Sequence, residues 1–470
     1  MESRPSKVRR VIQRENDGVR WQLQPDFAPL LEEVLQSPGQ MVKETPVKQV
    51  TLHRLGDKTF YVKRYLHRAV PLRPLKFFLK PSQARQEWRL AQQLAARGVP
   101  TVRHLALGER RTWSGVQESI LVTEGFDGVP LVQAPGIDPA AVLQFVQHMH
   151  ACGVLQQDLH PANLLVRPEP LELRLVDLHG ARVRLQLSAA ERQKNLALLR
   201  AFLPVPVSPA IERCSRALRQ KLLYQRSKRC LGRNREFASQ RLGGLRWQLR
   251  LPLLNDAVRR VLKNPDEFLK SRAQILKPGR TSTVGRADGL VLKRFNLRKI
   301  ENLVKDLVRP SRARRAFWAA YHLELVGIPT ARPIAAATRR VGGLLLRSYL
   351  LMEELAAVTD LGAYLRACLG SPPALVRQAA RLIGRLHQEG FSHRDLKETN
   401  LVLDPQGRLY LLDLDGLEFW RQVTASRAAA DLLRLAQAVA KFSAVTAQHR
   451  RLFLRTYCRA RGLKEVPRNA

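Results

Sequence analysis

The pattern of hydrophobic and polar positions divides the chain into strand-rich and helix-rich stretches, and the same order occurs twice. Residues 50–65 and 289–295 have the β-branched, alternating character of strands. Residues 83–98, 312–327 and 375–390 have apolar residues at helical spacing, and each segment ends at a glycine. The pattern therefore predicts an α+β fold of two tandem units, each with a small β-rich lobe followed by a short helical lobe.

Five sequence landmarks recur in the same order, which indicates an internal duplication. They are YVKRY and VLKRF, LAARGVPT and LELVGIPT, ILVTE and LLMEE, QQDLHPANLLV and SHRDLKETNLVL, and LRLVDLHG and LYLLDLDG. We expect a first unit at residues 1–205, a basic connector at 206–264 and a second unit at 265–470. The second copy has a few extra residues around 363–370, which predict an added helix.

Charge is the unusual property of the composition. Lys and Arg number 80 against 40 Asp and Glu, a formal net charge of +40, while 45% of the residues are hydrophobic, as in folded proteins. Such a surplus indicates anionic partners: nucleic acid, anionic lipid or phosphorylated substrates. The basic connector lacks the interleaved aromatic residues of single-strand-binding platforms, so nucleic-acid binding is the weakest of these predictions.

The distribution of cysteines and of apolar residues favours a cytoplasmic protein. The five cysteines have neither paired nor metal-ligand spacing, which is typical of a reducing compartment. The polar N-terminus lacks the apolar core of a signal peptide, and no uninterrupted apolar run is long enough to cross a bilayer. We expect contact with a membrane, if any, through charge alone.

The second copy contains residues suited to phosphoryl transfer from ATP, in the order that kinases use. Lys293 lies on a strand and can hold the nucleotide phosphates. Asp395 can orient or deprotonate the acceptor hydroxyl, and Lys397 can neutralise charge on the transferred group. Asn400 and Asp413 offer the oxygen ligands that Mg²⁺ requires. Any one of these residues alone could be an ordinary surface group, but the combination predicts a kinase-type fold.

Two further features of the second copy bear on nucleotide binding. Gly279 and Gly285 lie just before the lysine strand, where a loop covering the phosphates is expected, although a simple turn is an alternative interpretation. The helix that should supply a glutamate partner for the lysine has Ala316 at the matching position, and Glu324 lies two turns further along. We therefore expect a weakly held lysine in this copy.

The first copy matches with changes. Lys63, Asp158, Asn163 and Asp177 occupy the positions of the ATP lysine, the catalytic aspartate and the two magnesium ligands. Glu87 lies on the following helix and is the expected partner of Lys63. No clear glycine-rich segment precedes the lysine strand in this copy.

The segments after the two magnesium aspartates are short. No Ala-Pro-Glu follows Asp413, and both copies pass quickly into a helix. A long activation segment supports peptide substrates in protein kinases, so its absence favours a small acceptor. In these helices Asp431 and its counterpart Asn195 could brace the catalytic-loop backbone, or Asp431 could be a solvated residue near a helix start.

Taken together, the lysine strands, GVPT and GIPT, DLHPAN and HRDLKETN, and the short helical lobes resemble the bacterial lipopolysaccharide core kinases, the heptose and Kdo kinases. The resemblance implies a protein-kinase-like fold, ATP and Mg²⁺ as cofactors, and a sugar hydroxyl of lipopolysaccharide core or another anionic glycolipid as acceptor, at the cytoplasmic face of the inner membrane. Two alternatives stay open at this point: a protein Ser/Thr or Tyr kinase, and a non-catalytic pair acting as a membrane-associated scaffold.

Overall fold

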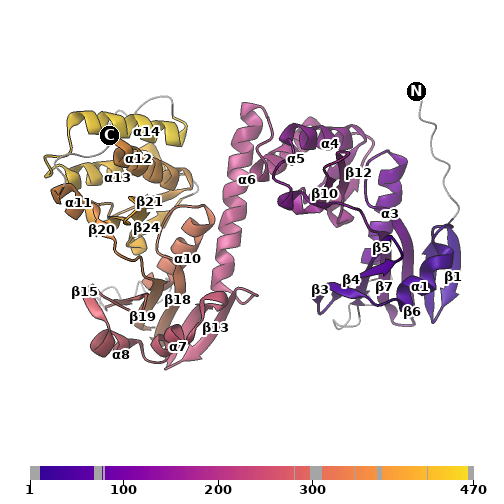
Figure 1. Cartoon of the computed structure of the whole chain (residues 1–470), viewed down its shortest axis with the longest axis horizontal. Helices are drawn as coiled ribbons and strands as arrows, with labels where there is room; N and C mark the ends of the chain where they lie inside the picture. Colours follow the sequence, from indigo (N-terminus) through magenta and orange to yellow (C-terminus); the bar gives the residue numbers. More distant parts are fainter. Residues whose placement is uncertain are drawn as a thin grey trace. The chain divides into compact units, whose positions relative to one another are not determined.

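The structure is a computed structural model that describes residues 11–67, 77, 80–279, 281–296, 310–342, 344–367, 373–420 and 422–463. The chain forms two compact units, unit 1 at Met1–Arg219 and unit 2 at Gln220–Ala470 (Figure 1). Each unit has a sheet lobe followed by a helical lobe, which confirms the predicted α+β organisation.

The sheet lobe of unit 1 contains a seven-stranded antiparallel sheet in the order β1-β2-β6-β7-β5-β4-β3. Its strands are β1 Ile12–Asn16, β2 Val19–Leu23, β3 Gln40–Thr45, β4 Lys48–Leu55, β5 Lys58–Leu66, β6 His104–Thr112 and β7 Gly115–Glu124. Helices α1 (Leu31–Gln36) and α3 (Gln83–Ala96) pack against this sheet. A core of buried apolar residues from the strands and α1 holds the lobe together.

Unit 2 repeats this topology, in the order β13-β14-β18-β19-β17-β16-β15. Its strands are β13 Phe237–Leu242, β14 Leu245–Arg250, β15 Gln274–Pro278, β16 Ser282–Ala287, β17 Leu290–Phe295, β18 Pro333–Val341 and β19 Leu344–Glu353. Helix α10 (Arg312–Leu325) takes the position of α3, beside the sheet (Figure 1). The helices α7 (Asp256–Lys263) and α8 (Pro265–Glu267) precede β15.

Part of the stretch that we expected to be a connector belongs to the second sheet lobe. Strands β13 and β14 and helix α7 all lie within 206–264. Yet β13 pairs with β14, β14 pairs with β18, and the helix contributes Val258, Val261 and Leu262 to a buried core. The duplication also extends further than the five landmarks, because β2 has the sequence VRWQL and β14 contains LRWQL. The tryptophan of each is buried.

The two helices that follow the lysine strands begin and end in the same way. Ser82 caps α3 by accepting from the backbone N–H of Arg85, and Ser311 caps α10 by accepting from that of Arg314. Each helix is followed by a glycine with positive φ, a conformation that favours glycine because it has no Cβ. The sequence pattern therefore predicted both helices to within a few residues.

The segments that follow each seven-stranded sheet form the helical lobe of that unit. In unit 1 they contain β8 Val129–Pro130, α4 Pro139–Ala151, β9 Val154–Gln156, β10 Leu164–Arg167, β11 Glu172–Leu175, β12 Ala181–Val183 and α5 Ala189–Phe202. In unit 2 they contain β20 Thr359–Asp360, α11 Leu361–Ala367, α12 Pro373–Gln388, β21 Phe391–His393, β22 Leu401–Leu403, β23 Leu409–Leu411, β24 Leu417–Phe419, α13 Ala425–Val439 and α14 Ala447–Arg461. Helix α11 is the helix predicted from the extra residues of the second copy, part of which lies outside the described residues.

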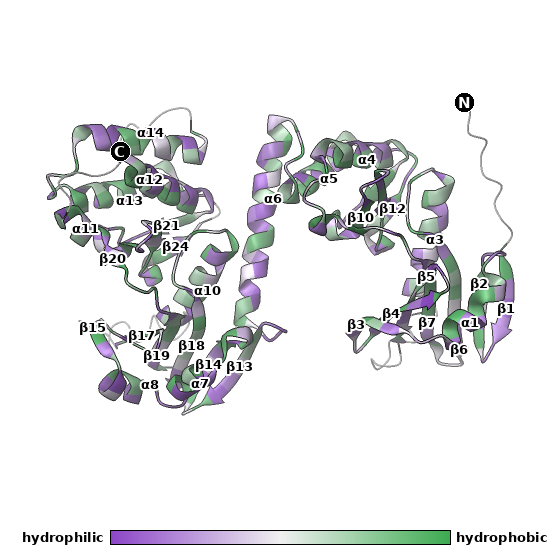
Figure 2. Cartoon of the chain, in the orientation of Figure 1, coloured by the Kyte–Doolittle hydropathy of each residue, from purple (hydrophilic) through white to green (hydrophobic). Residues whose placement is uncertain are grey.

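Helix α6 (Pro209–Lys228) contains the boundary between the units. Hydrophilic and hydrophobic bands alternate along it in Figure 2. Near its end Ser227 accepts a hydrogen bond from the Trp318 indole N–H at 2.8 Å and lies 2.9 Å from His322 Nδ1, so this end is anchored to α10. Across the described ranges, we find no helix with the length and apolar character needed to span a membrane.

Candidate active sites

In unit 1 the lysine strand and the following helix meet through a buried ion pair. Lys63 lies on β5 opposite Val50, and its Nζ is 2.6 Å from Glu87 Oε1 on α3. The Glu87 side chain is only 1% exposed, and Tyr65 donates to its second oxygen at 3.2 Å. Burial by itself would raise the pKa of Glu87, but Lys63 and His104 outweigh it and hold that pKa well below its usual value. Glu87 is therefore a fixed anion that orients Lys63.

Asp177 and His179 lie next to this pair. One ligand atom from each of Glu87, Asp177 and His179 lies within 4.8 Å of the others. His179 Nε2 is 3.0 Å from the Tyr65 hydroxyl, whereas the Asp177 side chain is exposed. Asp177 has left-handed backbone dihedrals, which an aspartate adopts at modest cost. An exposed carboxylate beside the lysine is suited to a divalent cation.

The catalytic loop of unit 1 brings together the other two residues predicted for it. Asn163 donates from Nδ2 to the main-chain oxygen of Asp158 at 3.0 Å and to its carboxylate at 3.4 Å. The amide oxygen of Asn163 is left for a cation, since the nitrogen is committed to Asp158. His160 accepts from the backbone N–H of Ala162 and its ring contacts Phe202, so it is engaged within its own lobe.

In unit 2 the lysine is held differently. Lys293 Nζ donates to Asp413 and, at 2.8 Å, to Asp415, and Arg312 of α10 donates to the other oxygen of Asp415. Burial alone would raise the pKa of Asp415, but a hydrogen bond from Asp413 and the charges of Lys293 and Arg312 hold it below its usual range. Burial and the neighbouring Asp415 raise the pKa of Asp413. Lys293 is therefore firmly held, contrary to our expectation from Ala316.

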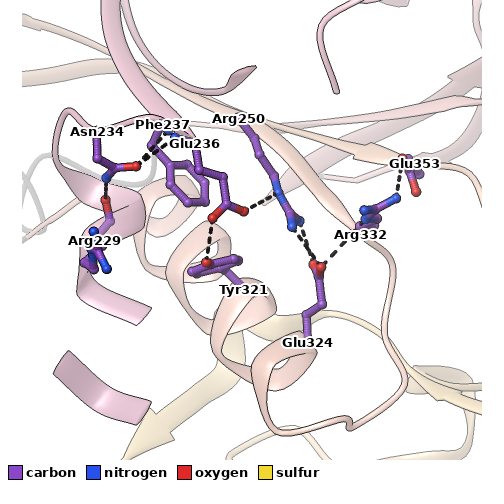
Figure 3. Close-up of polar contacts among 9 residues, drawn as sticks. All are labelled: Arg229, Asn234, Glu236, Phe237, Arg250, Tyr321, Glu324, Arg332 and Glu353. Carbon is purple, nitrogen blue, oxygen red and sulfur yellow. Dashed lines mark hydrogen bonds and ion pairs between the residues drawn. The ribbon is translucent and has the colours of Figure 1, made fainter. Parts of the chain in front are cut away.

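The position of Glu324 explains why it does not replace the missing helix glutamate. Figure 3 shows Glu324 joined to Arg250, with which it makes two hydrogen bonds of 2.7 and 2.9 Å. Arg250 also binds Glu236, while Arg332 lies 3.7 Å from Glu324 and 3.6 Å from Glu353. Ala316 itself is buried in the core under α10. Glu324 thus ties α10 to β14 and is committed away from Lys293.

The catalytic loop of unit 2 has the same geometry as that of unit 1, with one addition. Asn400 donates to the main-chain oxygen of Asp395 at 2.7 Å, so its amide oxygen is again left for a cation. Lys397 Nζ lies 2.8 Å from the Asp395 carboxylate, and both side chains are well exposed. Asp413 has the same left-handed backbone dihedrals as Asp177. Carboxylate and amide oxygens are the ligands that magnesium prefers, so the residues present fit that ion.

Each catalytic loop is braced from the helix that follows it. In unit 2 the buried Asp431 accepts the backbone N–H of His393 at 2.7 Å and lies 3.1 Å from His387 Nε2. In unit 1 Asn195 instead donates to the main-chain oxygen of Gln156 at 2.7 Å. Of the two interpretations of Asp431, the structure favours the brace over a solvated residue.

The two glycines expected to cover the phosphates have separate roles. Gly279 lies in the turn between β15 and β16, next to the lysine strand, with Arg280 outside the described residues. Gly285 lies within β16, where an added Cβ would come within 2.9 Å of Leu269 and 2.8 Å of Ala273. Packing therefore accounts for Gly285, while the turn at Gly279 has the position of a phosphate cover.

Sequence reasoning missed Asp415, Arg312 and the residues other than Lys63 that lie against Glu87. The DLDG motif contained Asp415, but nothing in the sequence indicated that its side chain turns toward the lysine strand. His104 and Tyr65 lie on strands and had no motif to distinguish them.

The chain matches the family model described as the lipopolysaccharide kinase (Kdo/WaaP) family over residues 32–220 and again over 278–457. Among curated relatives, a 3-deoxy-D-manno-octulosonic acid kinase of Xylella fastidiosa (strain M12) is 34% identical over 115 residues, covering 23% of this chain and 45% of the relative. The lipopolysaccharide core heptose(II) kinase WaaY of Escherichia coli (strain K12) is 29% identical over 121 residues, covering 25% of this chain and 51% of the relative. The chain thus spans about half the length of these relatives.

A structure titled "WaaP in complex with acyl carrier protein" aligns with 23% identity and a TM-score of 0.35, covering 44% of this chain and 88% of that one.

Proposed function

The chain belongs to the lipopolysaccharide kinase (Kdo/WaaP) family, and from this premise we propose that it transfers the γ-phosphoryl group of ATP to a sugar hydroxyl of lipopolysaccharide core or a similar anionic glycolipid. The observation that carries the proposal is the recurrence of one geometry in both units. Each places an aspartate and an asparagine in hydrogen-bond contact on the catalytic loop, and a carboxylate-bound lysine on the sheet. This geometry suits phosphotransferases with several kinds of acceptor, and membership of the family supports a sugar as the acceptor here.

The catalytic aspartates, Asp158 and Asp395, orient the acceptor hydroxyl and take up its proton as the new phosphorus–oxygen bond forms and the bond to the ADP oxygen breaks. Lys397, beside Asp395, neutralises charge on the transferred group. His160 stands at this position in unit 1 and is engaged elsewhere, so unit 1 lacks this contribution.

The nucleotide is held from the sheet lobe. Lys63 and Lys293 bind its phosphates, and the turn at Gly279 covers them in unit 2. Mg²⁺ would be held by Asn163 and Asp177 in unit 1 and by Asn400 and Asp413 in unit 2; when bound, it neutralises phosphate charge. Asp413 would then serve both the ion and Lys293. Because Lys293 also pairs with Asp415, it would keep a carboxylate partner when Asp413 binds the ion.

The formal charge of +40 supports a peripheral location on the cytoplasmic face of the inner membrane. Each well-placed Lys or Arg contributes about 1 kcal/mol to binding of an anionic membrane. The same charge supports an acceptor that is itself anionic.

A second candidate is that one unit binds the acceptor or the membrane without catalysing. The engagement of Lys293 by two carboxylates supports this for unit 2, because its lysine is less available to a nucleotide than Lys63. Transfer assays of Asp158→Asn and Asp395→Asn separate the two possibilities.

The experiment measures transfer of labelled γ-phosphate to extracted lipopolysaccharide core by the wild type, Asp158→Asn, Asp395→Asn and the double variant. Loss of a catalytic base lowers the rate by roughly 10²- to 10⁴-fold, so the double variant should be inactive. Asp288→Asn is a matched control, because this aspartate is exposed in the turn between β16 and β17, with a positive φ that asparagine accepts.

If only one single variant loses activity, the other unit is a binding module. If the double variant keeps wild-type transfer while Asp288→Asn behaves like the wild type, catalysis at these loops is excluded. Transfer to a generic protein but not to the core would favour the protein-kinase alternative.

A further inference from the structure

A cavity of about 520 Å³ lies on the sheet lobe of unit 2, between β13, β14, β18 and the first turn of α10. Five of its lining residues are exposed arginines: Arg241, Arg246, Arg314, Arg339 and Arg340. No aspartate or glutamate is among the described residues that line it. So many guanidinium groups around one hollow create a strongly positive potential.

The corresponding place in unit 1 is occupied by a carboxylate. In the strand registers Arg20 pairs with Glu109 in unit 1, and Arg246 pairs with Thr338 in unit 2. Thr338 therefore stands where Glu109 stands. The sequences around these positions, VRWQL and LRWQL, agree with this alignment.

Glu109 is a buried anion held by the residues around it. Its side chain is 2% exposed and accepts from Ser82 at 2.5 Å, from Arg85 at 2.6 and 3.1 Å, and from Arg111 at 2.9 and 3.1 Å. Burial alone would raise its pKa, but the hydrogen bonds from Arg85 and Ser82 outweigh it and lower that pKa. In unit 1 these donors thus bind an anion, and that anion is the unit's own Glu109 carboxylate.

Unit 2 keeps the cations of this site without the carboxylate. Ser311 is the N-cap of α10 and Arg314 lies in its first turn, as Ser82 and Arg85 do in α3. A second acid is also replaced: Glu15 opposes Arg20 across β1 and β2, at 3.4 Å, but Arg241 opposes Arg246 across β13 and β14. The exchange of acids for Thr338 and Arg241 leaves a positive cavity where unit 1 has internal ion pairs.

We propose that this cavity is an anion-binding site, separate from the nucleotide sites, that takes a phosphate-bearing ligand at the position of the Glu109 carboxylate. The arginine fork matches the geometry of phosphate oxygens and binds them through paired hydrogen bonds. The volume accommodates a phosphate with an attached group, and Ser239 and Thr338 add hydroxyls to the lining. The phosphate can belong to a soluble compound or to a lipid headgroup.

The test restores the carboxylate. Binding of pyrophosphate to the full chain is measured by titration calorimetry for the wild type, Thr338→Glu and Thr338→Gln. Thr338→Glu should remove one binding event, or weaken it at least tenfold, and should raise the melting temperature because the new carboxylate pairs with the arginines. Thr338→Gln has the same size without the charge and should keep the binding event.

Unchanged pyrophosphate binding in Thr338→Glu would overturn the proposal, as would equal loss in Thr338→Gln, since volume and not charge would then be responsible. Flotation with phosphatidylcholine vesicles, with and without phosphatidic acid, identifies the source of the phosphate. If Thr338→Glu lowers both pyrophosphate binding and flotation with phosphatidic acid, a lipid headgroup reaches the site. If it lowers pyrophosphate binding alone, the ligand is soluble.

Discussion

The buried pair of Lys63 and Glu87 offers a quantitative test of how unit 1 holds its lysine. We consider Glu87→Gln, which keeps the size of the side chain and its ability to accept from Tyr65 while removing the charge. The exposed fractions of the paired side chains are 15% for Lys63 and 1% for Glu87. Breaking a buried pair by removing one charge costs about 3–5 kcal/mol, and the retained hydrogen bond places this variant near 3 kcal/mol.

The expected loss translates into a measurable change in melting temperature. For a unit of this size each kcal/mol corresponds to roughly 2–4 °C, so the unfolding transition of unit 1 should fall by about 6–12 °C at neutral pH. Calorimetry records the transition, and hydrogen exchange of peptides from α3 assigns it to unit 1. Glu418→Gln is the matched control, because its pair with Arg394 is exposed and is worth about 0–1 kcal/mol.

The pH dependence of unfolding separately tests whether the ionised Glu87 stabilises unit 1. The pKa of Glu87 in the folded chain lies below the ordinary value of 4.5, so its contribution to stability is complete above pH 4.5 and is lost as the pH falls through the lower folded value. The difference between wild type and Glu87→Gln should therefore shrink in acid. A shift at neutral pH no larger than that of Glu418→Gln would refute the assignment of Glu87 as the fixed partner of Lys63.

Three further predictions concern unit 2. Asp431→Ala should lower its free energy of unfolding by about 3 kcal/mol and speed hydrogen exchange at His393, because the buried carboxylate holds that N–H; unchanged exchange would argue against the brace. Gly285→Ala should cost about 1–3 kcal/mol in chemical denaturation by crowding Leu269, whereas weaker ATP binding without destabilisation would point to a phosphate contact. Burial, and to a lesser extent Lys228, lowers the pKa of His322 to about 4, so unit 2 should lose up to about 3 kcal/mol of its free energy of unfolding as the pH falls from 6.5 through 4. A His322→Asn variant should show a flatter dependence of stability on pH, and identical dependences would contradict this.

The sequence was sufficient for the regular elements because their signals are local. The helical spacing and the serine and glycine at the ends of α3 and α10 are readable within one segment. The strands β13 and β14 were harder. Their repeated element is only five residues long, and the many arginines around it resemble a solvated connector. The pairing of β13 with β14 and of β14 with β18 is therefore visible only in three dimensions.

The site was predictable to the level of residue types but not of partners. Lys63, Asp158, Asn163 and their counterparts followed from motif order. The partner of Lys293 did not, because the replacement for the helix glutamate comes from a segment more than a hundred positions away. Long-range compensation of this kind leaves no local pattern.

The two units solve one electrostatic problem in two ways. Glu87 and Ala316 are each the fifth residue after the N-cap serine of their helix. His179 lies two positions after Asp177, and Asp415 lies two positions after Asp413. An aspartate at position 179 would place another carboxylate beside the buried Glu87, a like-charge contact that raises the free energy of both ionised groups.

Like-charge repulsion therefore disfavours a unit that carries both the helix glutamate and the second aspartate, and we expect the two positions to be coupled. In unit 1 the lysine depends on the placement of α3, since Glu87 belongs to that helix. In unit 2 it depends on the loop that also carries Asp413, and α10 contributes Arg312 to the cluster. A movement of the helix should consequently disturb Lys63 directly, while Lys293 should respond first to whatever binds Asp413.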